Sequence, residues 1–198
     1  VRRQRQMCIR DSLYAVKPIQ LIMHPFSVTK PKFLSPDSER PLDVQYRGSG
    51  YSPIAGYPRS RSRELMMEMM GESIIKISDI TKRIPKEEFI KEGQSSKCIL
   101  SPFGWGEICG RDFEAFVYGG CMIKQDMSHC VTYPNAYQPG VTYVPLKWDF
   151  SDFKEKLSKA TSPEYKELAK KAQEYYKHFF TPEGRMDFAK HIVSELER

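Results

Sequence analysis

Short apolar runs alternate along the chain with stretches that carry helix signals. The short runs, bounded by glycine or polar residues, predict β-strands over 43–47, 73–77, 97–100, 121–124 and 142–144. Capping residues, glycine stops and apolar faces predict helices over 62–70, 85–92, 111–118, 151–158, 163–179 and 185–196. This alternation predicts an α/β fold: a Rossmann-like parallel sheet flanked by helices, with a helical tail.

The loops after the predicted strands are where we expect a ligand. Ligands of parallel sheets bind beyond the carboxyl ends of the strands. That rule selects the loops 47–62, 101–110, 125–141 and 145–150. The methionine-rich face of the helix over 62–70 is instead typical of a core.

Proline interrupts the N-terminal part of the chain. Its prolines are Pro18, Pro25, Pro31, Pro36 and Pro41. They leave no room for a regular element, so residues 13–42 are expected to be a linker or the end of a truncated N-terminal domain. Residues 43–198 then form one domain that ends in C-terminal helices.

The net charge of +6 invites a nucleic-acid interpretation, but the charge is unevenly placed. Residues 1–12 hold four of the 31 basic residues and one of the 25 acidic ones, which is half of the net charge. Residues 2–12, RRQRQMCIRDS, resemble the translation of a transposase adapter used for sequencing libraries; the alternative is a natural basic tail. We therefore expect 1–12 to be adapter-derived or disordered, the chain to start inside a longer protein, and no nucleic-acid partner.

The remaining cysteines do not form a recognisable metal or disulfide pattern. They are Cys98, Cys109, Cys121 and Cys130. None forms a CxxC pair, and His129–Cys130 has no second pair of ligands near it in sequence, so we expect reduced, structural cysteines and no metal. No run approaches the roughly 20 apolar residues that span a bilayer, so no membrane span is expected in this chain; the compartment stays open.

The richest segment for chemistry is 101–126, SPFGWGEICGRDFEAFVYGGCMIKQD. Gly104 and Gly106 let a ligand approach the backbone, although glycines in such turns also serve geometry alone. The helix that follows points amide groups at an anion, and Arg111 adds a cation for phosphate. Glu114 lies one turn into an otherwise apolar helix, where a carboxylate can accept hydrogen bonds from both ribose hydroxyls; the alternative is an exposed glutamate on a solvent face.

The run FEAFVYGGCMI resembles the helix–glycine–strand segment of the group-1 glycosyltransferases. The order continues with KQDMSH, TYVPLKWD and SDFKEKL, as in the C-terminal domain of GT-B enzymes, including the exostosin-like and CAP10-like transferases. The similarity covers about 97–160 well and 43–96 loosely. It implies the C-terminal, nucleotide-sugar-binding half of a GT-B fold.

The resemblance also implies roles for matching residues. Glu114 matches the glutamate that holds the donor ribose, and Glu107 resembles the earlier glutamate of the paired motif, a candidate catalytic residue near the donor sugar. Here the two lie seven residues apart instead of the usual eight of retaining enzymes, which leaves the stereochemistry open. Arg111 falls where related families place a cation near the diphosphate.

Three further residues are candidates for the donor site. Arg47 follows the first predicted strand, where a phosphate-binding cation is common; a surface arginine is the alternative. Trp105 can stack on a base or simply pack, and Lys124 can line the site or lie in solvent.

We expect a glycosyltransferase fragment that binds a nucleotide sugar as substrate and needs no cofactor or metal. The glycan, lipid or protein acceptor would bind the missing N-terminal half, so the chain alone would be inactive. A nonenzymatic Rossmann-like scaffold domain is the alternative, because fold does not fix function.

Overall fold

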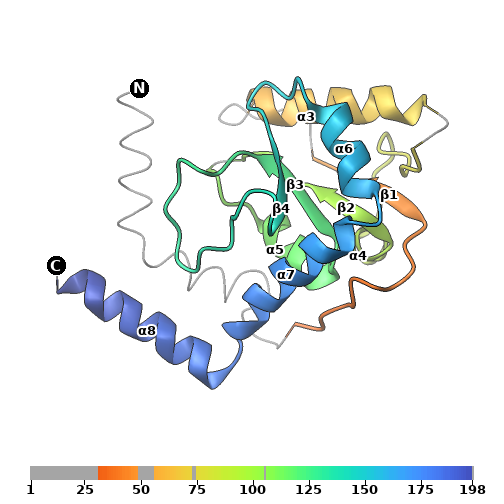
Figure 1. Cartoon of the computed structure of the whole chain (residues 1–198). Coiled ribbons are helices and arrows are strands. Elements are labelled where there is room, and N and C mark those ends of the chain that lie inside the picture. Colours follow the sequence, from red (N-terminus) through yellow and green to blue (C-terminus); the bar gives the residue numbers. More distant parts are fainter. Residues whose placement is uncertain (1–30, 49–55, 73–74, 105, 198) are drawn as a thin grey trace.

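A four-stranded, fully parallel sheet forms the centre of the computed structural model, which describes residues 31–48, 56–72, 75–104 and 106–197 (Figure 1). The strands are β1 (Leu42–Gln45), β2 (Ser96–Leu100), β3 (Cys121–Gln125) and β4 (Tyr143–Leu146), in the order β1-β2-β3-β4. Val44 pairs with Cys98, Cys98 with Cys121, and Ile123 with Val144. All four carboxyl ends therefore meet at one edge of the sheet.

Six helices accompany this sheet in the described residues, which confirms the α/β, Rossmann-like prediction. They are α3 (Gly56–Met70), α4 (Lys86–Gln94), α5 (Gly110–Tyr118), α6 (Phe153–Thr161), α7 (Tyr165–His178) and α8 (Pro182–Leu196). Side chains of α3 and α6 pack in one core cluster with alternate strand residues such as Cys98 and Ile123. Those of α5 and the later part of α7 pack in a second cluster with Ile99 and Met122. Period-two alternation along β2 and β3 thus supplies both faces of the core.

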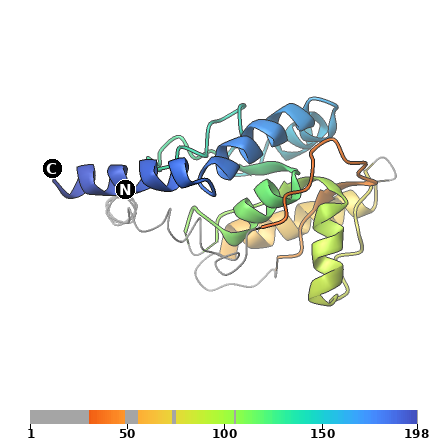
Figure 2. The same cartoon turned by 90° about the horizontal axis from the view of Figure 1, so that it is seen from below.

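The methionine-rich face of α3 lies in the core, as its pattern predicts. Met66 and Met69 are fully buried, and Leu65 lies beside them. The helix begins at Gly56, six residues before the expected start. The tail helix α8 extends away from the sheet in both views (Figure 2).

The prediction of a strand over 73–77 is wrong, because the described part of this segment forms a single bridge and no extended strand. Residues 73–74 lie outside the described part, and Ile77 makes an isolated parallel bridge with Val44. The amide of Lys76 donates to the carboxylate of Asp43 at 2.8 Å. A side chain therefore takes the donor that a strand ladder would use, and pairing stops after one bridge.

The proline-rich segment is described from residue 31 onward, and that part packs against the sheet and helices. The guanidinium of Arg40 is buried and donates to the carbonyls of Gln94, Ser96 and Tyr118. The amide of Leu34 donates to the carbonyl of Val117 at 3.0 Å. Residues 31–41 therefore belong to the same packed unit as the sheet.

Candidate functional site

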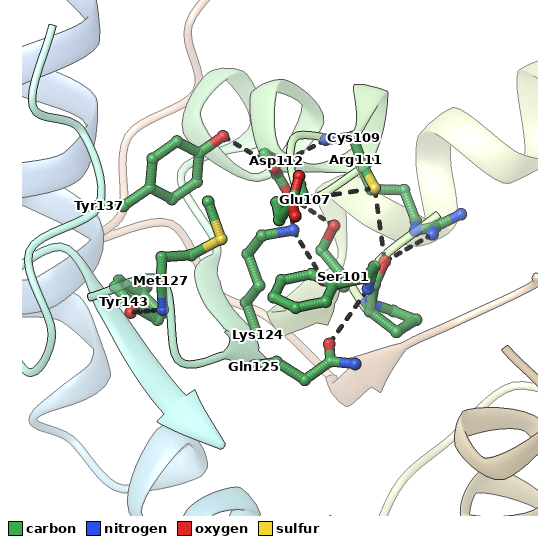
Figure 3. A network of polar contacts seen from close by, with 12 residues as sticks. Ser101, Glu107, Cys109, Arg111, Asp112, Lys124, Gln125, Met127, Tyr137 and Tyr143 are labelled. Carbon is green, nitrogen blue, oxygen red and sulfur yellow. Dashed lines mark hydrogen bonds and ion pairs between the residues drawn. The ribbon is translucent and has the colours of Figure 1, made fainter. Parts of the chain in front are cut away.

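A buried polar network lies where the carboxyl ends of β2 and β3 meet the start of α5 (Figure 3). At its centre, Asp112 accepts hydrogen bonds from the hydroxyl of Ser101 at 2.5 Å and from the hydroxyl of Tyr137 at 2.8 Å. The ammonium of Lys124 lies 3.2 Å from the same carboxylate. The amide of Cys109 donates to it at 2.9 Å and so caps the first turn of α5. Both carboxylate oxygens are thereby satisfied without solvent.

The network explains how a lysine can end a buried strand. Lys124 has no exposed surface, so the alternative of a solvated lysine is wrong. Its ammonium also donates to the carbonyl of Ser101 and lies 5.1 Å from the ring centroid of Phe103. A buried charge is tolerated only when it is paired and hydrogen-bonded, as here. Lys124 on β3 thus links the end of β2 to the first turn of α5.

Two carboxylates lie on either side of the beginning of α5. Glu107 is only 6% exposed, and Glu114 is partly buried. In each, one buried oxygen, Oε2, has no hydrogen-bond partner among the described residues. Burial raises the pKa of Glu114, and the neighbouring Arg111 partly offsets that effect. Since most buried polar atoms in folded proteins are paired, these two oxygens are unusual.

Arg111, at the start of α5, lies near Glu114. Its guanidinium donates to the carbonyl of Pro102 at 3.3 Å and lies 5.5 Å from the ring centroid of Tyr46. The Nε atoms of Arg111 and of Arg59 on α3 are buried and lack a partner within the described residues. Burial raises the pKa of Tyr46, and both cations act against that shift. Two guanidinium groups therefore approach Tyr46, just past the end of β1.

Arg47, the other cation expected at the donor site, is bound to α4. Its guanidinium forms an ion pair with Glu92 at 2.6 Å and donates to the carbonyl of Lys82 at 2.9 Å. Both charged side chains are largely buried. Arg47 therefore holds β1 to α4, and a phosphate would have to displace Glu92 to reach it.

The glycine loop before α5 is closed on itself. The amide of Gly104 donates to the carbonyl of Gly106 at 3.0 Å. A Cβ atom at Gly104 would lie 3.2 Å from the sulfur of Cys109, whereas Gly106 has open space around its Cα. The loop is thus tight at Gly104 and accessible at Gly106, and Trp105 between them lies outside the described residues.

An aromatic group borders the same edge. Trp148, 44% exposed after β4, packs edge-on against Phe103 and His129, with centroids 5.2 and 5.0 Å away. Trp148 lies in the loop 145–150, where a ligand is expected, but no sequence pattern marks Trp148 itself. The ring of Tyr133 stacks on that of His191 in α8, with the two ring centroids 3.8 Å apart.

Asp112, Ser101 and Tyr137 were not among the residues expected at the site. The available signal for Asp112 was its position as the third residue of α5, where a carboxylate caps a helix. Ser101 and Tyr137 are 11 and 25 residues from Asp112, so only the fold brings them together.

The ligand sets at this edge include one that suits a metal ion. Single ligand atoms of Glu107, His129 and Cys130 all lie within 4.8 Å of one another.

The described cysteines are free of disulfides. Among the described helices, none combines the length and apolar character needed to cross a membrane.

Neither the models of known protein families nor the curated proteins give a match to this chain. The features of the site itself are two carboxylates with oxygens unpartnered among the described residues, two guanidinium groups and a helix N-terminus at one edge of a parallel sheet.

Proposed function

We propose that this chain is the donor-binding half of a GT-B-type glycosyltransferase, which transfers a sugar from a nucleotide sugar to a hydroxyl acceptor. The unpartnered oxygens of Glu107 and Glu114 carry the proposal. A buried oxygen without a partner costs about 1–3 kcal/mol, which a ligand with hydroxyl donors recovers on binding. Ribose and hexose rings are rich in such donors.

The surroundings of the two glutamates fit the other parts of a nucleotide sugar. The N-terminus of α5 and Arg111 favour an anion, and Arg59 adds a second guanidinium with an unpartnered Nε among the described residues. In the proposed arrangement Glu114 binds the ribose, Arg111 and the α5 amides bind the diphosphate, and Glu107 faces the donor sugar. The resemblance of FEAFVYGGCMI to the group-1 enzymes supports the same assignment.

In this proposal the domain acts by positioning the donor and by stabilising the departing diphosphate. Fixed dipoles and cations aimed at a leaving group lower the barrier because they need no reorganisation during the reaction. The group that activates the acceptor hydroxyl would lie in the other half of the enzyme. The chain alone is therefore expected to bind donor without turning it over.

Calorimetric titration of the full chain with UDP and with GDP tests the proposal. We expect one of the two to bind with 1:1 stoichiometry. Glu114→Gln removes a charged hydrogen-bond acceptor worth about 1.5–3 kcal/mol, so affinity should fall about 10- to 150-fold. The matched control is Glu174→Gln, which changes an exposed glutamate of α7 and should leave affinity unchanged.

Two results would contradict the assignment. Binding that is equally strong in Glu114→Gln and Glu174→Gln would remove Glu114 from the nucleotide site. A folded chain that binds neither nucleotide at millimolar concentration would favour a nonenzymatic scaffold domain instead.

A further inference from the structure

Two loops at the carboxyl edge bring a carboxylate, an imidazole and a thiol together. Glu107 comes from the loop between β2 and α5, and His129 and Cys130 from the loop after β3. The Nε2 atom of His129 lies 3.9 Å from Oε1 of Glu107 and 3.2 Å from the sulfur of Cys130. Metal–ligand distances of about 2.0–2.3 Å place the ligand atoms of a tetrahedral zinc site roughly 3.2–3.8 Å apart. The two distances from His129 are close to that range, and all three ligand atoms lie within 4.8 Å of one another.

Protein contacts alone leave Glu107 poorly compensated. Its side chain is more than nine-tenths buried, and Oε2 has no partner among the described residues. The contact between Oε1 and His129, at 3.9 Å, is longer than a hydrogen bond. A buried carboxylate in this position lacks the pairing that normally accompanies burial. A divalent cation between the three ligands would supply it.

The loop that carries His129 and Cys130 is held in place by its own hydrogen bonds. Asp126 accepts from the amide of Ser128 at 3.0 Å, and the amide of Cys130 donates to the carbonyl of Met127 at 2.8 Å. The amide of Met127 in turn donates to the buried hydroxyl of Tyr143 at 2.9 Å. This turn holds the backbone that carries the two ligands before any ion binds, which limits the ordering cost of binding.

We propose that Glu107, His129 and Cys130 bind a zinc ion. Thiolate, imidazole and carboxylate together match the ligand preferences of Zn²⁺, and three protein ligands leave the fourth tetrahedral position for water or a substrate oxygen. On binding, the thiol of Cys130 releases its proton to solvent, because the thiolate is the form that ligates. Glu107 is shared with the proposed donor site, but zinc binding is tested without nucleotide, so the two proposals can fail separately.

Cobalt(II) replaces zinc in such sites and reports the geometry by visible absorption. Metal-free full chain, titrated with Co²⁺, should develop the intense absorption of a tetrahedral cobalt–thiolate centre and saturate at one equivalent. Added Zn²⁺ should displace the cobalt. Glu107→Gln, His129→Gln and Cys130→Ser should each weaken binding by more than about tenfold, since even outer-shell partners of metal ligands contribute 10–100-fold.

Matched controls separate this site from adventitious binding. Glu174→Gln and His178→Gln change an exposed glutamate and a histidine at the end of α7, and both should bind cobalt as the unmodified chain does. Binding that persists in all three site variants would overturn the proposal, as would the absence of a one-equivalent complex in the unmodified chain. X-ray absorption of the zinc form, which needs no variant, should show one sulfur ligand; a spectrum with no sulfur would refute the assignment.

Discussion

Replacing Lys124 by methionine should destabilise the protein strongly, although the two side chains are similar in length. The change removes the cation from a pair whose two side chains are both fully buried, 3.2 Å apart. Asp112 keeps three donors, from Ser101, Tyr137 and Cys109, but loses its compensating charge. Breaking a buried pair in this way costs about 3–5 kcal/mol, a large part of the 5–15 kcal/mol that holds a typical domain together.

Urea unfolding at pH 7, analysed by linear extrapolation, measures the loss. Lys154→Met is the control, because that ammonium pairs with Glu72 at the surface, at 2.7 Å, and should matter little. Tyr137→Phe provides a milder test. Burial raises the pKa of Tyr137 well above the usual value, so the Tyr137 hydroxyl stays protonated and donates to Asp112. The free energy of unfolding of Tyr137→Phe should be lower by about 1.5–3 kcal/mol. If Lys124→Met were no less stable than Lys154→Met, the buried network would not hold the edge of the sheet.

Three further outcomes follow from single groups. Burial raises the pKa of Glu114 above its ordinary 4.5, so the stability that this group contributes is present below that pH and is lost as pH rises through the folded pKa. In thermal unfolding, the stability of Glu114→Gln relative to the unmodified chain should therefore increase between pH 4 and pH 7. A difference that stays the same over this range would contradict the burial of Glu114. Gly119→Ala should cost at least about 1–2 kcal/mol in urea unfolding, since φ is +68° and the new Cβ would lie 2.6 Å from the carbonyl oxygen of Leu34; a neutral substitution would refute that close approach. Burial raises the pKa of Cys121 to about 12 and also that of Cys98, so neither should react with a thiol reagent at pH 8 until the protein unfolds; mass spectrometry that finds rapid native labelling of either would contradict their place in the core.

The sheet and its helices could be predicted from local patterns because each element carries its own signal. Strands at 97–100 and 121–124 are apolar runs; the structure extends the first by one residue at its start and the second by one residue at its end. The segment 73–77 has the same signal but forms one bridge, because the carboxylate of Asp43 competes for its backbone. Such competition depends on a residue some thirty positions away, which no local window contains.

The candidate site was only partly predictable for the same reason. Glu107, Arg111 and Glu114 lie close together in sequence, and the structure keeps them around the start of α5. Arg47 is bound to Glu92, 45 residues later, so its sequence position after β1 did not reveal its partner. His129 and Cys130 meet Glu107 only because β2 and β3 are neighbours in the sheet. Ion pairs and ligand clusters between distant segments require the tertiary structure.

A crystal structure of the full chain with the nucleotide that binds it tests the proposed donor site most directly. The ribose hydroxyls should lie within hydrogen-bond distance of Glu114, and the diphosphate should lie at the N-terminus of α5, beside Arg111. A nucleotide bound elsewhere, for example in the hollow at the amino edge between Asp43, Lys97 and Lys154, would contradict that placement.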